Sequence, residues 1–522
     1  MKTPARAADP VALVFLAIAG LCAVFAYVGL STSGYWIDEL FALFLIDHSG
    51  GLAEVMRRSL TDTHPPLFYL LAYGWTQVFG VSETGARSFS ATLMVASLAL
   101  LFAVLRRLYS TRAAAFGVAV AASSKLFFEQ SQNLRNYPLT VLLGVALAGA
   151  TLAIRRRAAA GTIPAWMAAA FWAIGLAGSF THFYLFLAVG AAHLFLLIQL
   201  QGAKRRGWVL LSGASIFAPV AAYVVLLTRG SQQDVQNMWF SNALADLFIQ
   251  LVRGLTQAWS WTALGAIALL AAIALLRRRP DAVEAADPER RAAAQLSALV
   301  IVLVIAAGLT VSLAIAPSFG ARNLVVLGPF FWIAAAGLYD AAAPRLGKFG
   351  GQALVVALVV LLAGNVANLR GRFLVRAEAF RESAALVAGE PACAGQSIPV
   401  VFPDLFGPPT PFFRALTRDA FFGRYYPASR LTVVTPDAFA GPKADPQIMA
   451  LWRARLSGGC PVLAWGVHDI DADRAERLAE DLARTAGVDR RRIRVRTVST
   501  AKMIVFGASK TRPSAFVFER AS

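Results

Sequence analysis

The apolar run "VALVFLAIAGLCAVFAYVGL" occupies residues 11–30 and carries no charged side chain. As a helix it is about 30 Å long, which matches the hydrocarbon core of a bilayer. Comparable runs recur as far as residue 368, and only 15% of the 522 residues are charged. No small-residue cleavage site follows the first run, so we expect a retained membrane helix rather than a cleaved signal peptide. The sequence therefore predicts a polytopic α-helical membrane protein.

Short basic clusters between the apolar runs carry much of the formal net charge of +19. Such clusters face the cytoplasm in membrane proteins, so we expect no nucleic-acid partner. The N-terminus is then inside and residues 369–522 are outside, with about 11 transmembrane helices between them. The clusters are Arg106-Arg107 with Arg112, Arg155–Arg157, Lys204–Arg206, Arg277–Arg279, and Arg345 with Lys348. The predicted spans are 11–31, 86–106, 113–129, 138–154, 164–181, 183–200, 208–228, 257–276, 293–316, 322–340 and 350–368.

The stretch "HPPLFYLLAYGWTQVFG", residues 64–80, does not fit as a span, because it is short and carries Gln77. Counting it as a span would also place Arg106 and Arg107 outside and reverse every later helix. We expect a helix that lies along the outer surface and begins after its two prolines. The preceding segment "FALFLIDHSGGLAEVMRRSL" is typical of one or two interfacial helices. The first outer loop, residues 32–85, is therefore predicted to be structured and amphipathic.

The composition changes after residue 369. Strand-like runs at 398–402, 431–434, 461–465, 492–499, 502–507 and 515–519 alternate with helical patterns at 374–389, 446–456 and 471–486. This predicts a membrane module over 1–369 and a periplasmic soluble α/β domain over 370–522. Cys393 and Cys460 both lie in this domain. An oxidising compartment favours a disulfide between them, and two free buried thiols are the alternative.

Two adjacent carboxylates, Asp38 and Glu39, follow the first span in the stretch "GYWIDEL". Acids just beyond a helix end can serve interfacial solvation alone, with the neighbouring aromatic rings in the membrane interface. A partly desolvated carboxylate at this depth can instead act as a general base on an acceptor hydroxyl. Hard cations also bind carboxylates, but the sequence has no Asp-x-Asp and no paired-His helix motif. We therefore expect no cofactor, and a divalent metal is possible but not favoured.

Donor-type side chains gather on the same predicted outer side. Arginine can clamp a phosphate with its planar fork of N–H groups, or can simply extend toward lipid headgroups. Histidines at this depth can donate to a phosphate or make structural hydrogen bonds. The cytoplasmic loops are short and show no phosphate-binding glycine loop, so a nucleotide donor is not expected. The candidate residues for phosphate and sugar binding are His64, Arg135, Tyr137, His182, Tyr184 and Arg322.

Five stretches together resemble the C-type glycosyltransferase superfamily (GT-C): the Asp-Glu pair, "HPPLFYLL", "SQNLRNYPL", "THFYLFLA" and "ARNLVVLGPFFWIAAAGL". The similarity runs in order over residues 10–370 and favours the branch of protein O-mannosyltransferases and aminoarabinose-to-lipid-A transferases. It implies a polyprenyl-phosphate-linked sugar donor and inverting transfer at the outer face. It also implies that Asp38 is the catalytic acid and that His64, Arg135, Tyr137 and Arg322 hold the donor phosphate.

The resemblance and the predicted topology together suggest a glycosyltransferase of the bacterial inner (plasma) membrane. Its partners would be the lipid-linked donor, a lipid, glycan or protein acceptor, and the membrane lipids themselves. A membrane transporter or flippase of a polyprenyl-linked sugar is the main alternative, and a sugar-lipid receptor is a third. Transport requires ionisable or broken-helix elements near the bilayer midplane. The predicted spans carry almost no charge there, which favours catalysis at the surface.

Overall fold

The computed structural model divides into two compact units, which we describe separately. The membrane unit comprises residues 1–28, 48–80 and 85–370, and the C-terminal unit comprises residues 29–47, 81–84 and 371–522. The first outer loop is thus shared between the two units. The residues that the structure describes are 9–60, 62, 64–230, 242–258, 265, 268, 270, 272–273, 287–315, 317–369, 378–402, 410–440, 444–456, 460–467, 472–499 and 513–521.

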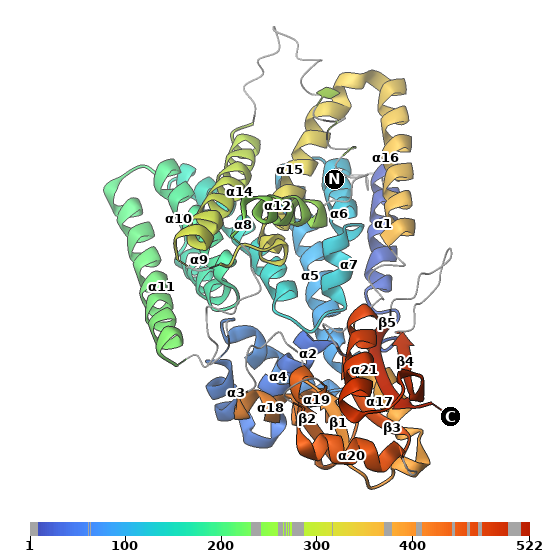
Figure 1. Ribbon diagram of the computed structural model, residues 1–522. Coiled ribbons are helices and arrows are strands. Elements are labelled where there is room, and N and C mark those ends of the chain that lie inside the picture. Colours follow the sequence, from blue (N-terminus) through green and yellow to red (C-terminus); the bar gives the residue numbers. More distant parts are fainter. Residues whose placement is uncertain are drawn as a thin grey trace. The chain divides into compact units, whose positions relative to one another are not determined.

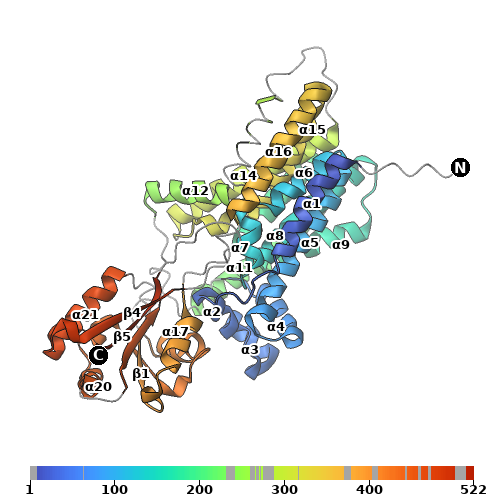
Figure 2. The same ribbon diagram turned by 90° about the vertical axis from the view of Figure 1, so that its right-hand side faces the viewer.

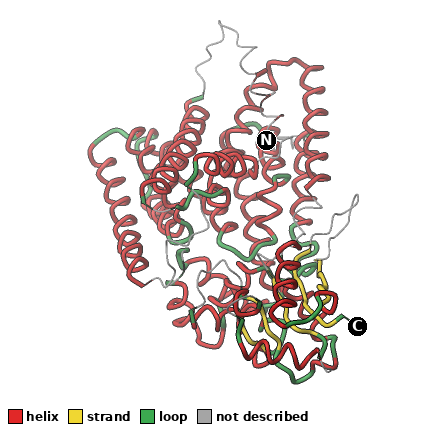
Figure 3. The backbone as a smooth tube through the Cα atoms, viewed as in Figure 1, coloured by secondary structure: helices red, strands yellow, loops and turns green. Residues whose placement is uncertain are grey.

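The membrane unit is built of α-helices (Figures 1 and 3). Among the described residues, five helices are long and apolar enough to cross a membrane: 83–108, 137–159, 203–227, 288–314 and 321–342. The protein is a multi-pass membrane protein. The helices of this unit are α1 (Pro10–Phe25), α3 (Gly51–Ser59), α4 (Leu67–Phe79), α5 (Glu83–Leu108), α6 (Thr111–Ala122), α7 (Lys125–Ser131), α8 (Tyr137–Ala159), α9 (Ala165–Ser179), α10 (Phe183–Gln199), α11 (Ala203–Gly230), α12 (Leu244–Ala258), α14 (Pro288–Ala314), α15 (Gly328–Ala342) and α16 (Gly347–Leu369), with short 3₁₀ turns η1 (His48–Gly50), η3 (Ala321–Leu327) and η4 (Ala343–Leu346).

Ion pairs join the helix ends that carry the basic clusters. Arg155, near the end of α8, pairs with Glu289 at the start of α14 at 2.9 Å. Arg290 pairs with Asp340 of α15 at 2.7 Å. Since α8 begins at Tyr137, eighteen residues before Arg155, about 27 Å of helix separates this basic end from the opposite end of the unit.

Some predicted spans differ in detail from the structure. The predicted helix 113–129 is two helices, α6 and α7, because the Ser124 side chain accepts the Phe127 N–H and starts a new helix. The predicted helix 322–340 begins as the 3₁₀ segment η3 before Pro329 opens α15. The predicted span 257–276 falls mostly outside the described residues. The stretch 64–80 forms α4, whose 13 residues extend only about 20 Å and are too short to cross a bilayer.

The C-terminal unit contains a mixed five-stranded sheet with the strand order β2-β1-β3-β5-β4. Strands β1–β2 and β1–β3 are parallel, and β3–β5 and β4–β5 are antiparallel. Figure 2 shows the sheet with α17 on one side and α20 and α21 on the other. The elements are α2 (Ile37–Leu45), α17 (Phe380–Ala388), η5 (Pro391–Cys393), β1 (Ile398–Val401), α18 (Pro411–Leu416), the π-helix η7 (Thr417–Phe422), η8 (Ala428–Arg430), β2 (Leu431–Val434), α19 (Pro436–Phe439), α20 (Pro446–Leu456), β3 (Val462–Val467), α21 (Ala472–Ala486), η9 (Arg490–Arg492), β4 (Ile493–Ser499) and β5 (Pro513–Arg520).

Both faces of this sheet are covered by apolar side chains. Trp452 of α20 and Leu482 of α21 belong to one buried cluster with strand residues such as Leu463 and Phe518. On the other face, Trp465 packs edge-on against Phe422 of η7, with ring centroids 4.6 Å apart. Cys393 and Cys460 form a disulfide, with Cα atoms 4.3 Å apart. The predicted strand 502–507 lies outside the described residues, and the other five predicted strands coincide with β1 to β5.

Candidate active site

Several chain segments meet at the end of the membrane unit opposite the basic clusters. The segment before α4 carries His64, the link between α7 and α8 carries Arg135, and His182 is the N-cap residue of α10. Two prolines force the chain into α4 after His64, and the Leu67 N–H donates to the Phe180 carbonyl at 3.0 Å. This bond ties the start of α4 to the end of α9, so that the segments bearing His64 and His182 lie side by side.

The link between α7 and α8 is held by hydrogen bonds to three other segments of the membrane unit. Gln132 Nε2 donates to the Val28 carbonyl at 2.9 Å. Ser90 Oγ of α5 donates to the Asn133 carbonyl at 2.7 Å, and Asn136 Nδ2 donates to the Thr181 carbonyl at 3.0 Å. Arg135 is therefore presented on a fixed backbone, and its side chain is buried.

Asp62 is a buried carboxylate at the centre of this group of side chains. Its Oδ2 atom accepts a hydrogen bond from the Tyr69 hydroxyl at 2.7 Å and lies 3.4 Å from Nδ1 of His64. Burial alone would raise the pKa of the Asp62 carboxyl. The hydrogen bond and charge of His64, with the charge of Arg135 and the Tyr69 hydroxyl, outweigh burial and hold the pKa of Asp62 below its usual value. Asp62 is thus a buried anion that faces His64 and Arg135.

His182 presents a buried N–H donor. Its Nδ1 atom accepts the Tyr184 backbone N–H at 3.1 Å and so caps α10. Burial, reinforced by the charges of His64 and Arg135, lowers the pKa of His182 to about 3. The ring is therefore neutral at physiological pH, and its proton sits on Nε2 because Nδ1 accepts. Within the part of the chain that the structure describes, the buried Nε2 atom makes no hydrogen bond of ordinary geometry. The nearby Asn323 side chain opposes part of the lowering of the His182 pKa.

Aromatic rings surround the two histidines. The His182 ring lies 6.1 Å from that of His64, 5.7 Å from that of Tyr137 and 6.0 Å from that of Tyr184, measured between centroids. The Tyr184 hydroxyl donates to the Ser318 carbonyl at 3.2 Å, and Asn323 Nδ2 donates to the same carbonyl at 2.7 Å. We call Asp62, His64, Tyr69, Arg135, Tyr137, His182 and Tyr184 the donor cluster.

The remaining predicted site residues, Arg322, Asp38 and Glu39, do not belong to the donor cluster. Arg322 is half-buried in η3, beside Asn323 in the chain. Asp38 and Glu39 belong to the C-terminal unit, in the first turn of α2. There the two acids differ, because Asp38 is partly exposed whereas Glu39 is fully buried. Glu39 Oε2 accepts the Trp36 backbone N–H at 3.4 Å, so Glu39 helps to fix the start of the helix.

Sequence reasoning missed Asp62 and Tyr69. Asp62 lies between two threonines just before the His-Pro-Pro stretch, where a polar residue is typical of an ordinary surface loop. Tyr69 follows in an apolar helix and resembles a membrane-interface residue. Their pairing depends on the chain turning at Pro65 and Pro66, which brings α4 back toward Asp62. The available signal was the Asp-x-His spacing, because a carboxylate two residues from a histidine can orient it.

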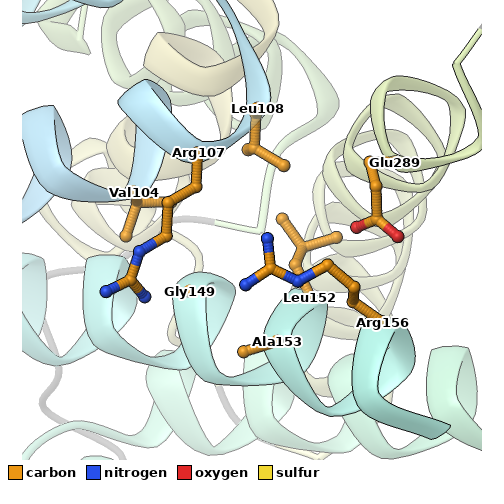
Figure 4. A pocket seen from close by; sticks show the side chains of 8 residues that line it. All are labelled: Val104, Arg107, Leu108, Gly149, Leu152, Ala153, Arg156 and Glu289. Carbon is orange, nitrogen blue, oxygen red and sulfur yellow. The ribbon is translucent and has the colours of Figure 1, made fainter. Parts of the chain in front are cut away.

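The cavity in Figure 4 lies at the basic end and is not the candidate active site. It is lined by Arg107, Arg156, Glu289 and five other residues and has a volume of about 30 Å³, room for roughly one water molecule. Among the described residues, no three His, Cys, Asp or Glu side chains gather as a metal site.

The fold resembles that of a known class of membrane enzymes, the C-type glycosyltransferases. Residues 63–227 match the family model described as dolichyl-phosphate-mannose-protein mannosyltransferase. The matched segment contains all the histidine, arginine and tyrosine residues of the donor cluster. No curated protein sequence matches the chain.

Solved structures show the same fold over nearly the whole chain. The chain is similar to the apo crystal structure of ArnT from Cupriavidus metallidurans, with a TM-score of 0.50 and 16% identity over 97% of both chains. The same values hold for the structure of that ArnT bound to undecaprenyl phosphate. The expected resemblance to the C-type glycosyltransferase superfamily is thus confirmed at the level of the fold.

Proposed function

We propose that the protein is an inverting glycosyltransferase that moves a sugar from a polyprenyl-phosphate-linked donor to an acceptor on the periplasmic face of the membrane. The observation that carries this proposal is the donor cluster: the buried Arg135 and two histidines beside the carboxylate of Asp62. The Nε2–H of His182 has no hydrogen-bond partner among the described residues. Such a group of fixed N–H donors is suited to binding an anion. The family match over the same residues and the lipid phosphate bound by the similar ArnT structure support a lipid phosphate as that anion.

The donor cluster would stabilise the phosphate as it leaves. Cleavage of the bond between the sugar's anomeric carbon and the phosphate oxygen leaves the electron pair on that oxygen. Arg135 can contribute paired N–H groups to this charge, and His182 Nε2–H and His64 can donate single hydrogen bonds. Because these groups are fixed by the backbone contacts described above, they need little reorganisation as the charge develops. Tyr137, Tyr184 and Arg322 would complete the contacts to phosphate and sugar.

Asp38 would act as the general base, an assignment that rests on its motif. An acceptor hydroxyl attacks the anomeric carbon from the side opposite the phosphate, Asp38 takes the hydroxyl proton, and the product has inverted configuration. The proton is then on the Asp38 carboxyl group, and polyprenyl phosphate is released as the dianion. Glu39 holds the helix start through the Trp36 N–H, so we assign it a supporting role beside the base.

The proposal agrees with the cellular setting expected from the sequence. A lipid-linked donor is already activated and anchored at headgroup depth, so neither a nucleotide nor a metal is required at the outer face. We therefore place the protein in the bacterial inner membrane, with the acceptor being a lipid, a glycan or a protein.

A transfer assay on the full-length protein in lipid nanodiscs tests the proposal. The donors are undecaprenyl-phosphate mannose, aminoarabinose and galacturonic acid, and the signal is the release of undecaprenyl phosphate in the presence of an inner-membrane extract as acceptor. Wild-type protein should cleave at least one donor. Asp38→Asn should lose at least about 1000-fold of this rate, yet bind undecaprenyl phosphate like the wild type.

A matched control is Asp47→Asn, which makes the same chemical change at an exposed carboxylate of the same segment. This variant should retain wild-type activity. Cleavage of no donor by the wild type, or equal cleavage by Asp38→Asn, would refute the proposed function.

A further inference from the structure

The segment that leads to the two acids is bound almost entirely by side chains of the C-terminal unit. Three backbone N–H groups of residues 34–37 donate to side chains from residues 378–425. Gly34 N–H donates to Glu382 Oε1 at 3.2 Å, and Tyr35 N–H donates to the Tyr425 hydroxyl at 2.8 Å. Ile37 N–H donates to Glu378 Oε2 at 2.8 Å. The fourth, Trp36 N–H, donates to Glu39.

The carbonyl groups of the same segment are bound as well. Arg381 Nη1 donates to the Ser31 carbonyl at 3.0 Å, and its Nη2 donates to the Thr32 carbonyl at 3.1 Å. The backbone lies so close to Arg381 that a Cβ atom on Gly34 would be 2.7 Å from Arg381 Cβ. A side chain at position 34 would therefore push the segment away from α17. Side chains of residues 378–425 thus hold both the N–H and the carbonyl groups of this segment.

The other end of the first outer loop, residues 81–84, binds the same side chains of the C-terminal unit. Glu83 Oε1 accepts from Arg381 Nη1 at 3.3 Å and from the Tyr425 hydroxyl at 2.8 Å. The Tyr425 hydroxyl therefore accepts from Tyr35 and donates to Glu83, so it bridges the two ends of the loop. The Tyr35 hydroxyl donates to the Val81 carbonyl at 3.0 Å. Residues 29–47 and 81–84 accordingly fold as parts of the C-terminal unit.

Glu378 binds the residue that directly precedes the two acids. Its side chain is only 2% exposed, and it binds the N–H of Ile37, the first residue of α2. A carboxylate at this position satisfies an N–H that has no partner within the helix and lies at the positive end of the helix dipole. Asp38 is the next residue, so the backbone that carries it is held where Glu378 binds Ile37.

We propose that Glu378 is a positioning residue for Asp38, and that the C-terminal unit thereby sets the geometry of catalysis. This role rests on the proposed function, since it requires Asp38 to be the base. A base must lie within hydrogen-bond reach of the hydroxyl it deprotonates, and a misplacement of 1 Å can cost about 100-fold in rate. The role does not include binding of the donor phosphate, which the proposed function assigns to the membrane unit.

The test compares Glu378→Ala with Glu378→Gln in the full-length protein in nanodiscs. Glutamine retains an oxygen that can accept the Ile37 N–H, whereas alanine removes it. Glu378→Ala should lower kcat by about 10- to 100-fold and leave the KM for the donor that the wild type cleaves within about twofold. Glu378→Gln should restore kcat to within about fivefold of the wild type. Glu476→Ala, on the exposed face of α21, is the control and should be active.

Hydrogen–deuterium exchange supplies a readout that does not depend on catalysis. The peptide covering residues 31–41 should exchange faster in Glu378→Ala than in the wild type, and Glu378→Gln should resemble the wild type. Wild-type kcat in Glu378→Ala, or an equal loss of kcat in both variants, would overturn the positioning role, provided that Asp38→Asn is inactive. An active Asp38→Asn variant would instead refute the proposed function, in which Asp38 is the base. The Asp38 variant and the Glu378 variants thus test the two proposals separately.

Discussion

Replacing His182 by asparagine separates the two roles that the structure gives to this side chain. His182 caps α10 through Nδ1, which accepts the Tyr184 N–H at 3.1 Å. Its other nitrogen, Nε2, is buried and has no hydrogen-bond partner among the described residues. Asparagine is among the best N-cap residues, so it should preserve the cap. It is too short to present a donor where Nε2–H lies.

The expected loss follows from the hydrogen bond that the donor phosphate would make. A hydrogen bond to a charged group is worth about 1.5–3 kcal/mol, which corresponds to about 10- to 140-fold in affinity. His182→Asn should therefore weaken the binding of undecaprenyl phosphate by this factor, with little change in melting temperature. His182→Ala should lose the same affinity and, in addition, about 1 kcal/mol of folding stability through the lost cap.

The pH dependence provides an internal check. With its pKa lowered to about 3, His182 stays neutral throughout the range from pH 5.5 to pH 8. The ratio of wild-type to His182→Asn affinity should then be constant over this range, because no titration of His182 contributes to it. The assay is equilibrium binding of fluorescent undecaprenyl phosphate to each protein in nanodiscs. Equal affinity of the two proteins, or a ratio that rises as the pH falls toward 6, would refute the reasoning.

Four further predictions concern stability and cofactors. The pKa of His182 is lower in the folded protein than its ordinary value of 6.5, so its contribution to stability is complete above about pH 6.5 and is lost as the pH falls below it. The melting temperature should therefore fall less steeply with decreasing pH in His182→Asn than in the wild type. The same pH dependence in both proteins would contradict this. Asp62→Ala removes the acceptor of Tyr69 and the anion facing His64, so its unfolding free energy should fall by about 3–5 kcal/mol, whereas Asp62→Asn, which keeps an acceptor oxygen, should lose less in the same denaturant titration. Cys393→Ser opens a crosslink with a sequence separation of 67 and should cost up to about 4 kcal/mol of stability; reductant should lower the melting temperature of the wild type but not of the variant. EDTA should leave the rate of sugar transfer unchanged, and restoration of a lost rate by Mg²⁺ or Mn²⁺ would show that the site uses a metal.

Much of the architecture could be predicted because it depends on local chemistry. Runs of apolar residues predict helices that cross a membrane, and short runs of β-branched residues predicted the strands of the C-terminal sheet. The break between α6 and α7 was missed, although Ser123 and Ser124 precede Lys125 and serine is a common helix start. The uninterrupted hydropathy of residues 113–129 concealed this signal.

The sequence singled out the histidine and arginine side chains that the structure brings together, but not Asp62, which lies beside them. His64, Arg135 and His182 stand out because charged or polar residues at helix ends are conspicuous in an apolar chain. Asp62 does not stand out, because it lies in a polar loop where an acid has no special meaning. Its hydrogen bond from the Tyr69 hydroxyl forms only because the chain turns at Pro65 and Pro66.

The contacts around α2 lay beyond sequence reasoning for a different reason. Glu378 binds a backbone N–H 341 positions earlier in the chain, and Tyr425 binds one 390 positions earlier. A backbone amide has no side-chain signature, so no spacing or motif marks its partner. The difference in burial between Asp38 and Glu39 likewise has no signature in the sequence.

A density map of the protein with bound undecaprenyl phosphate, determined by electron cryomicroscopy in nanodiscs, addresses the central claim most directly. The account predicts phosphate density within hydrogen-bond distance of His182 Nε2 and the Arg135 guanidinium. A phosphate bound elsewhere, with both side chains still enclosed by protein alone, would contradict it.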